Sequence, residues 1–149
     1  MVNLIGFLKV RLLLHNKDLT KDYLKRCEAR LKAIQVLMNE QSYADVVRES
    51  QECIELALKA LLRSVGVIPP RTHDVSKLLL DEKDRFQGSL KKNVDKFAKI
   101  SKDLRRDREL AFYGSEDLTP SDFYSKEDAT QAFDSATWIL TEIQKQKIV

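Results

Sequence analysis

Apolar residues recur every three or four positions through the middle of the chain, between Ser42 and Gly66. In a helix of 3.6 residues per turn, this spacing gathers them into a band wide enough to contact two or three neighbouring helices. The members of the band are Tyr43, Val46, Val47, Cys53, Ile54, Ala57, Leu58, Leu61, Leu62 and Val65. The pattern therefore predicts a long central helix around which the rest of the chain packs.

The residues beside this helix indicate where it begins and ends. Ser42, with Asp45 three positions later, has the spacing of a capping box, and Gly66 suits a left-handed helix stop. The opposite face carries charged residues, with Glu55 and Lys59 in the favourable acid-first order four positions apart. We expect that face to be exposed to solvent.

Further helical patterns lie on both sides of the central helix. Residues 20–38 repeat apolar positions in alternating steps of three and four, and residues 89–113 and 125–143 each carry one apolar stripe. A short helix is expected from residue 74 to about residue 80, capped by Thr72. The sequence predicts an all-α fold, an antiparallel up-and-down bundle of four to five helices.

Composition supports one helical domain. The 149 residues include only four Gly and three Pro, and 33% are charged, a balance that favours helices over sheets. The net charge of +3 is too mild to indicate general affinity for polyanions. Cys27 and Cys53 have no CxxC partner, which favours two buried free thiols in a reducing compartment over a disulfide between adjacent helices or a reactive pair.

The first 18 residues form an apolar extension ahead of the bundle domain, residues 19–149. They are interrupted by Lys9 and Arg11 and are shorter than the roughly 20 residues that a membrane span needs. They also lack the basic start and the cleavage site of a signal peptide. We therefore expect a cytoplasmic protein with no membrane partner. The extension would be an extra helix covering the bundle or a partner subunit, or a non-native upstream start.

A row of cations lies on the outer side of the helix predicted at residues 89–113. It consists of Lys92, Lys96, Lys99, Lys102 and Arg106. Because acidic residues lie between these cations, one interpretation is an ordinary solvated face. The alternative is a surface that follows phosphates, since cations beside an aromatic ring suit single-stranded nucleic acid or a nucleotide. Tyr113 would share the face of Arg106 if the helix continues, whereas Arg108 would point near the apolar stripe and need a carboxylate or a subunit interface.

Familiar catalytic patterns are absent from the sequence. There is no glycine-rich phosphate loop, no HExxH and no nucleophile elbow. Only His15 and His73 could transfer protons as histidines, and the position of His73 beside a predicted helix cap favours a structural hydrogen bond. We expect no metal and no cofactor.

Two separated motifs resemble the signature of HEPN domains. The first is SYADVVRESQECIELALKALLRSVGVIPPRTHDVSKLL, and the second is RRDRELAFYGSEDLTP followed by YSKEDATQAFDSATWIL. The resemblance covers about residues 19–143 and is strongest to a small prokaryotic group of HEPN proteins. It implies an up-and-down helical bundle that dimerises through its long helices and is often encoded beside a minimal nucleotidyltransferase.

Many HEPN domains are metal-independent RNases or toxins that use an R-x4-6-H motif, with a polar residue after the Arg and a Tyr two positions after the His. Carried over to this sequence, Arg106 would be the Arg, Asp107 the polar residue and Tyr113 the Tyr. The His position holds Ala111, and the longer spacings reach Phe112 and Tyr113 instead of a His. Because an alanine cannot move protons, the resemblance leaves catalysis without its expected residue.

Three hypotheses follow for the function. The first is a homodimer that binds a nucleotide, single-stranded RNA or a nucleotidyltransferase partner without cutting RNA. The second is a ribonuclease toxin in which Arg106, Asp107 and Tyr113 suffice, or His73 enters from elsewhere in the dimer. The third is a purely structural helical dimer. The binding residues of the first hypothesis are Arg106, Arg108, Tyr113, Lys99 and Lys102.

Overall fold

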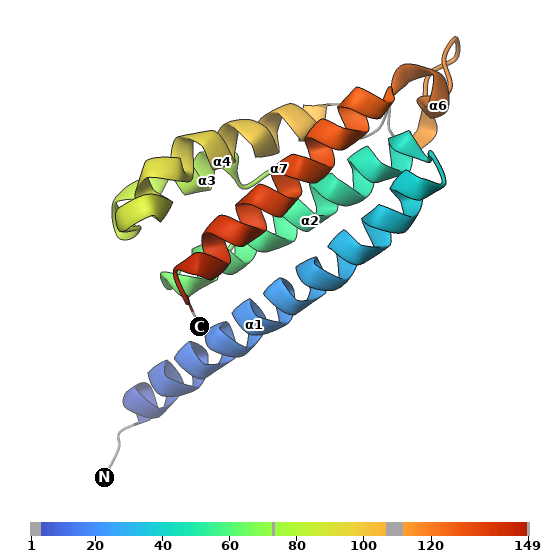
Figure 1. The fold of residues 1–149 in the computed structure, drawn as a ribbon. Coiled ribbons are helices and arrows are strands. Elements are labelled where there is room, and N and C mark those ends of the chain that lie inside the picture. The colour runs from blue at the N-terminus through green and yellow to red at the C-terminus, as the bar shows by residue number, and fades with distance from the viewer. Residues whose placement is uncertain (1–3, 73, 107–111, 149) are drawn as a thin grey trace.

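Helix α2, Tyr43–Ser64, is the central element of the fold, as the apolar pattern predicts (Figure 1). It packs against α1 (Leu4–Asn39), α4 (Gly88–Arg106) and α7 (Lys126–Lys145). These three long neighbours explain why the apolar band on α2 is so wide.

The remaining elements are short. They are α3 (Ser76–Asp81), the 3-10 turn η1 (Lys83–Arg85) and α6 (Pro120–Phe123). The computed structural model describes residues 4–72, 74–106 and 112–148, without the side chains of residues 13–15 and 106. Within these ranges the chain forms helices and no strand, so the all-α prediction is confirmed.

The core lies where α2 meets its long neighbours. Its largest fully buried side chains are Ile34, Ile54, Leu58, Leu61, Leu62, Leu79, Phe97, Ile139 and Ile143. Full burial of one such side chain stabilises the fold by about 1.5–3 kcal/mol. The apolar stripes predicted on the four long helices are therefore the surfaces that hold them together.

One predicted cap is present and another is not. At the start of α7 the Ser125 hydroxyl accepts the Asp128 N–H at 3.2 Å, and the Asp128 carboxylate accepts the Ser125 N–H at 2.8 Å, which completes a capping box. At the start of α2 the Ser42 hydroxyl bonds to the Asp45 carboxylate at 2.6 Å and caps no backbone N–H. The capping box predicted there is wrong. Gly66, with φ +82°, ends α2 as predicted.

The short helices differ from their predictions. Helix α3 begins at Ser76, and the Asp74 carboxylate accepts the Ser76 N–H at 3.0 Å, so Asp74 takes the role expected of Thr72. The segment 114–123, which no sequence pattern assigned to a helix, contains α6, because Thr119 caps a turn that begins with Pro120. Both corrections concern single turns, where one side-chain hydrogen bond decides the start of the helix.

The polar face of α2 is more covered than predicted. Glu55 is buried, and most other charged residues of this face are only partly exposed. The predicted pair of Glu55 and Lys59 is present at 2.8 Å, with side chains only 11% and 14% exposed. The prediction of a solvent-exposed face is therefore correct only in part, because helices pack around α2 on several sides.

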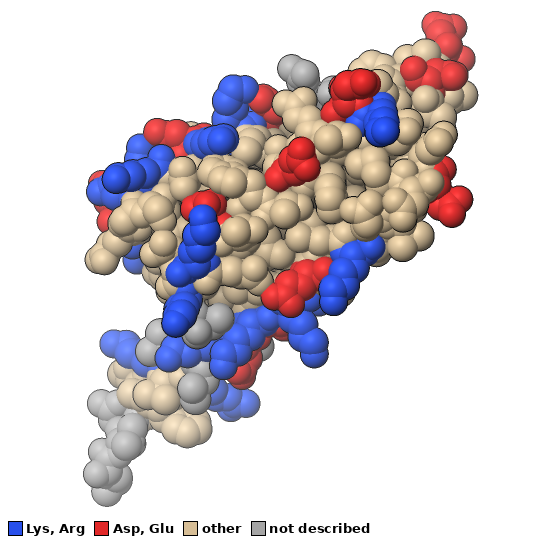
Figure 2. Space-filling view, viewed as in Figure 1, with Lys and Arg blue, Asp and Glu red and all other residues tan. Residues whose placement is uncertain are grey.

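The N-terminal extension lengthens the first bundle helix and does not cover the bundle. Asn16 accepts a hydrogen bond from Arg63 near the end of α2 at 2.8 Å, and α1 continues past this point for about 18 Å (Figure 1). Figure 2 shows Lys and Arg gathered where the projecting helix leaves the bundle. Its apolar side chains are exposed, namely Leu4, Ile5, Phe7, Leu8, Val10 and Leu12. No helix among the described residues is long and apolar enough to cross a membrane.

Candidate functional site

An ion pair joins the end of α4 to the segment before α3. Arg105 Nη1 lies 3.5 Å from Asp74 Oδ2, and the two side chains are 39% and 40% exposed. Hydrogen bonds from the hydroxyl and backbone N–H of Ser76, and then the positive charges of Arg105 and Lys102, hold the pKa of Asp74 below its usual value. The two sequence motifs, THDV and RRDR, therefore meet in space.

Two aromatic residues, Phe112 and Tyr113, follow the RRDR segment in the chain. The guanidinium carbon of Arg48 is 4.3 Å from the centre of the Phe112 ring. The rings of Phe112 and Tyr113 meet edge to face, with their centroids 4.4 Å apart. Phe112 is 48% exposed and Tyr113 77% exposed. The Tyr113 ring is thus open to solvent while its neighbour is held against α2, an arrangement that suits stacking on a planar ligand.

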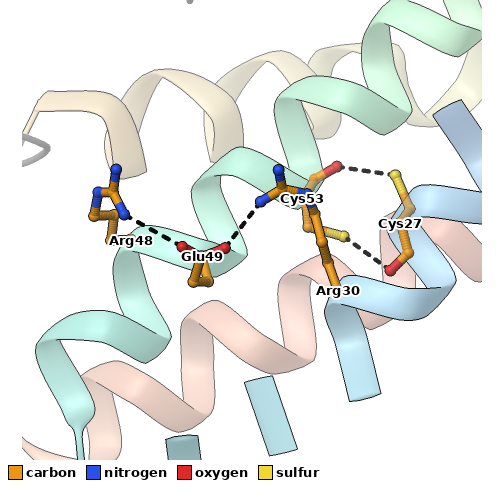
Figure 3. A network of polar contacts seen from close by, with 5 residues as sticks. All are labelled: Cys27, Arg30, Arg48, Glu49 and Cys53. Carbon is orange, nitrogen blue, oxygen red and sulfur yellow. Dashed lines mark hydrogen bonds and ion pairs between the residues drawn. The ribbon is translucent and has the colours of Figure 1, made fainter. Parts of the chain in front are cut away.

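A carboxylate shared between two arginines positions Arg48 (Figure 3). Glu49 accepts a hydrogen bond from Arg30 Nη1 of α1 at 2.9 Å and one from Arg48 Nη1 at 3.3 Å. The three side chains are 28–34% exposed, so solvent screens part of their attraction. This network connects α1, α2 and Phe112. Sequence analysis gave Arg30 and Arg48 no role in binding, and only their spacing around Glu49 could have indicated one.

The predicted basic row is divided between different partners. Lys99 pairs with Asp103 one turn away on α4, and both side chains are largely exposed. Lys102 is exposed and near enough to Asp74 to favour its carboxylate form. Exposed pairs of this kind contribute little stability, so a phosphate could take the place of Asp103 beside Lys99. The row is therefore a set of separate cations and not a uniform track.

A groove of about 650 Å³ lies between α4 and α7. Its lining includes Lys96, Ile100 and Trp138. The Lys96 ammonium is 4.0 Å from the centre of the Trp138 ring, whose other neighbour is Phe97 at a centroid distance of 5.3 Å. Trp138 thus anchors the contact between the two helices.

Several predicted site residues lie outside the described residues. They are Asp107, Arg108, Ala111, His73 and the side chain of Arg106. The predicted continuation of the helix from Arg106 to Tyr113 passes through residues 107–111, so it also lies outside the described residues. The described flanks are both anchored, because Arg105 contacts Asp74 and Phe112 contacts Arg48. Among the described residues, no three His, Cys, Asp or Glu side chains are grouped to hold a metal ion.

Comparison with known proteins identifies the fold that carries these contacts. The sequence model of the HEPN domain matches residues 20–146, which span both motifs, α2, α4, α7 and the part of α1 from residue 20 onward. The chain belongs to the HEPN domain family. The projecting part of α1 lies ahead of the HEPN match.

One relative of this HEPN protein is a Methanocaldococcus jannaschii protein named "Putative toxin MJ1304". The two sequences are 30% identical over 135 residues, which cover 87% of this chain and 88% of the relative. No solved structure matches the chain. Sequence similarity to this relative therefore covers nearly the whole HEPN bundle.

Proposed function

We propose that this HEPN protein is a homodimeric binding module that holds a nucleotide or single-stranded RNA without cutting it. The observation that carries the proposal is the exposed Tyr113 ring beside Phe112, which stacks on Arg48. Arg105 at the end of α4 flanks the same motif and is held by Asp74. An open aromatic ring near fixed cations matches the chemistry of a base attached to a phosphate.

The strength of such a site follows from its parts. Stacking of a base on an aromatic side chain contributes about 1–3 kcal/mol. Each phosphate neutralised by Lys or Arg adds a contribution that falls as salt rises. Because the basic row is divided, few phosphates would be contacted at once. We expect moderate affinity with a shallow dependence on salt concentration.

The absence of cutting follows from the chemistry of RNA cleavage. The attacking 2′-hydroxyl must lose a proton while the leaving oxygen gains one, so a group that exchanges protons near neutral pH is needed. The position where the family motif has His holds Ala111. Asp74 forms an ion pair with Arg105 of this motif, but the pKa of Asp74 is held below its usual value. A carboxylate of that kind is a weak base, and it does not replace an imidazole.

The partner expected from the family resemblance is a minimal nucleotidyltransferase. A HEPN module that binds RNA or a nucleotide without cutting would present this ligand, or the Tyr113 surface itself, to a second protein. Co-expression with a nucleotidyltransferase encoded next to the gene, followed by size-exclusion chromatography, tests the pairing. Separate elution of the two proteins at micromolar concentration would count against it.

The ligand part of the proposal is tested with a labelled single-stranded RNA. Fluorescence anisotropy measures binding, and a denaturing gel of the same samples measures cutting, both with a metal chelator present. Tyr113→Ala and Arg106→Ala should weaken binding. Lys25→Ala, which removes an exposed cation from α1, is the matched control and should bind as the unmodified chain does.

A second candidate function is a ribonuclease toxin, favoured by the word toxin in the name of the relative. In this case Arg106, Asp107 and Tyr113 would carry the reaction, or His73 would enter from the second subunit. The unmodified chain would then cut RNA in the assay above. Loss of cutting in Arg106→Ala would assign the activity to this site and not to a contaminating nuclease.

A further inference from the structure

Two cysteines face each other across the contact between α1 and α2. Cys27 and Cys53 are both free, and both are fully buried. The Cys27 Sγ lies 3.4 Å from the Cys53 carbonyl oxygen, and the Cys53 Sγ lies 3.7 Å from the Cys27 carbonyl oxygen (Figure 3). The contact is reciprocal, so each sulfur reaches the main chain of the opposite helix.

This reciprocal contact places the two sulfurs in the same narrow space. A disulfide needs the two Cα atoms about 4.4–6.8 Å apart and the side chains directed toward one another. Helices whose cysteine sulfurs touch each other's carbonyl groups are close enough to approach this requirement. Each thiol donates its one hydrogen to the carbonyl group of the other cysteine, so both sulfurs lie at the same crossing of α1 and α2.

The surroundings make the two thiols unequal. The interaction between the two thiols raises the pKa of Cys27, as does burial, and lowers the pKa of Cys53. The positive charge of Arg30 favours the thiolate of either residue. Arg30 is held beside the pair by its bond to Glu49 (Figure 3). Cys53 is therefore the sulfur that loses its proton first and attacks an oxidant.

We propose that Cys27 and Cys53 are a redox modification site, at which hydrogen peroxide forms an intramolecular disulfide that links α1 to α2. The Cys53 thiolate attacks one peroxide oxygen, the O–O bond breaks, and the released hydroxide takes a proton to become water. The Cys27 sulfur then loses its proton and attacks the sulfenic acid on Cys53. The S–S bond forms and the second oxygen leaves as water. In total, two thiols are oxidised and one peroxide is reduced to two waters.

The oxidant reaches the pair because it is small and uncharged, so a brief local opening of the α1–α2 contact admits it. The bond closes the segment between two residues 26 positions apart, which contains the turn between α1 and α2. Closing a segment of that length restricts the unfolded chain and raises the melting temperature by roughly 5–15 °C. Oxidation thus stabilises the helix pair that carries Arg30, Glu49 and Arg48.

The test uses the folded, reduced full chain. It is treated with hydrogen peroxide, denatured, alkylated with N-ethylmaleimide and examined by intact mass spectrometry. The expected product is a single chain that has lost two hydrogens and carries no alkyl group. After reduction it regains two alkylation sites. Before denaturation, the oxidised chain should melt at a higher temperature than the reduced chain. Two alkylated thiols after peroxide treatment, or a disulfide between two chains, would overturn the proposal.

Single variants test whether both cysteines are needed. In Cys27→Ser, dimedone should trap a sulfenic acid on Cys53, because the thiol that resolves it is missing. Neither Cys27→Ser nor Cys53→Ser should gain melting temperature after peroxide treatment. A gain in either variant, with both folded by circular dichroism, would contradict the disulfide as the source of the stabilisation.

Discussion

Tyr113 is the residue on which the proposed binding site depends most. Its ring is 77% exposed, and its neighbour Phe112 stacks on Arg48. Tyr113→Ala should weaken binding of single-stranded RNA by roughly 5- to 100-fold, because about 1–3 kcal/mol of stacking is lost. Tyr113→Phe keeps the ring and should bind nearly as the unmodified chain does. Anisotropy titrations at one fixed salt concentration measure both, and equal affinity for all three chains would remove Tyr113 from the site.

Ala111 offers a test in the opposite direction. Ala111→His restores the Arg106-x4-His pattern, which brings a phosphate-binding guanidinium and a proton-transferring imidazole into one motif. We expect this variant to cut RNA without metal, and Arg106→Ala in the same background to abolish the cutting. A denaturing gel in the presence of chelator measures it. A variant that folds, dimerises and binds RNA yet cuts nothing above background would show that more than the His is missing.

At the residue scale the sequence indicated some residues of the candidate site and missed others. Arg106, Tyr113 and Lys102 could be chosen because they belong to one motif or to one face of a helix. The Arg105–Asp74 pair and the Arg48–Phe112 contact each join a helix to a segment far from it in the sequence. Such contacts depend on how each helix is rotated about its axis, which periodicity fixes only to within about one residue position. Such contacts can therefore be recognised only when the packing of the helices is known.

At the scale of helices, the buried face of α2 is the feature that the fold depends on. Leu58 is fully buried in its middle. Leu58→Asp should unfold the domain, because an unpaired buried charge costs several kcal/mol. Val36→Asp is the matched control, since Val36 is 60% exposed on α1. Circular dichroism with thermal melting measures both, and retained melting temperature in Leu58→Asp would show that the core is misplaced.

Two serines that precede helices should behave differently when mutated. Ser125 accepts the Asp128 N–H, so Ser125→Ala should destabilise the fold by about 1 kcal/mol. Ser42 caps no backbone N–H and bonds only to the exposed side chain of Asp45, so Ser42→Ala should cost less. Urea unfolding at equal slope measures the difference. A larger loss for Ser42→Ala would contradict the hydrogen bonds described at the two helix starts.

Long elements were predictable from sequence, whereas of the short ones α3 was expected with a different cap and α6 was not expected. Each long helix has enough turns for its apolar stripe to be distinguished from chance, as in α2 and α7. In α3 and α6 a single side chain decides the boundary, and Asp74 or Thr119 can take this role as readily as a neighbour. The length of α1 was missed for a different reason, because an apolar run with two cations does not indicate whether it folds back or continues straight.

For the whole molecule, the projecting part of α1 gives a physical reason to expect a second copy. Its apolar side chains extend beyond the bundle without cover from the described part of the chain, and surfaces of this kind usually mark an interface. We expect a homodimer at micromolar concentration by multi-angle light scattering. A chain that starts at Leu19 shows which surface holds the dimer, since a dimer kept by the bundle helices survives this truncation. A monomeric full chain would contradict the expectation.

The central claim is that this HEPN protein binds single-stranded RNA or a nucleotide and does not cut it. The most direct measurement incubates the full chain with a labelled single-stranded RNA and chelator, and follows anisotropy and strand length in the same samples. We predict saturable binding that weakens in Tyr113→Ala and Arg106→Ala, with the RNA intact throughout. Cutting by the unmodified chain that disappears in Arg106→Ala would contradict the claim and establish a ribonuclease in its place.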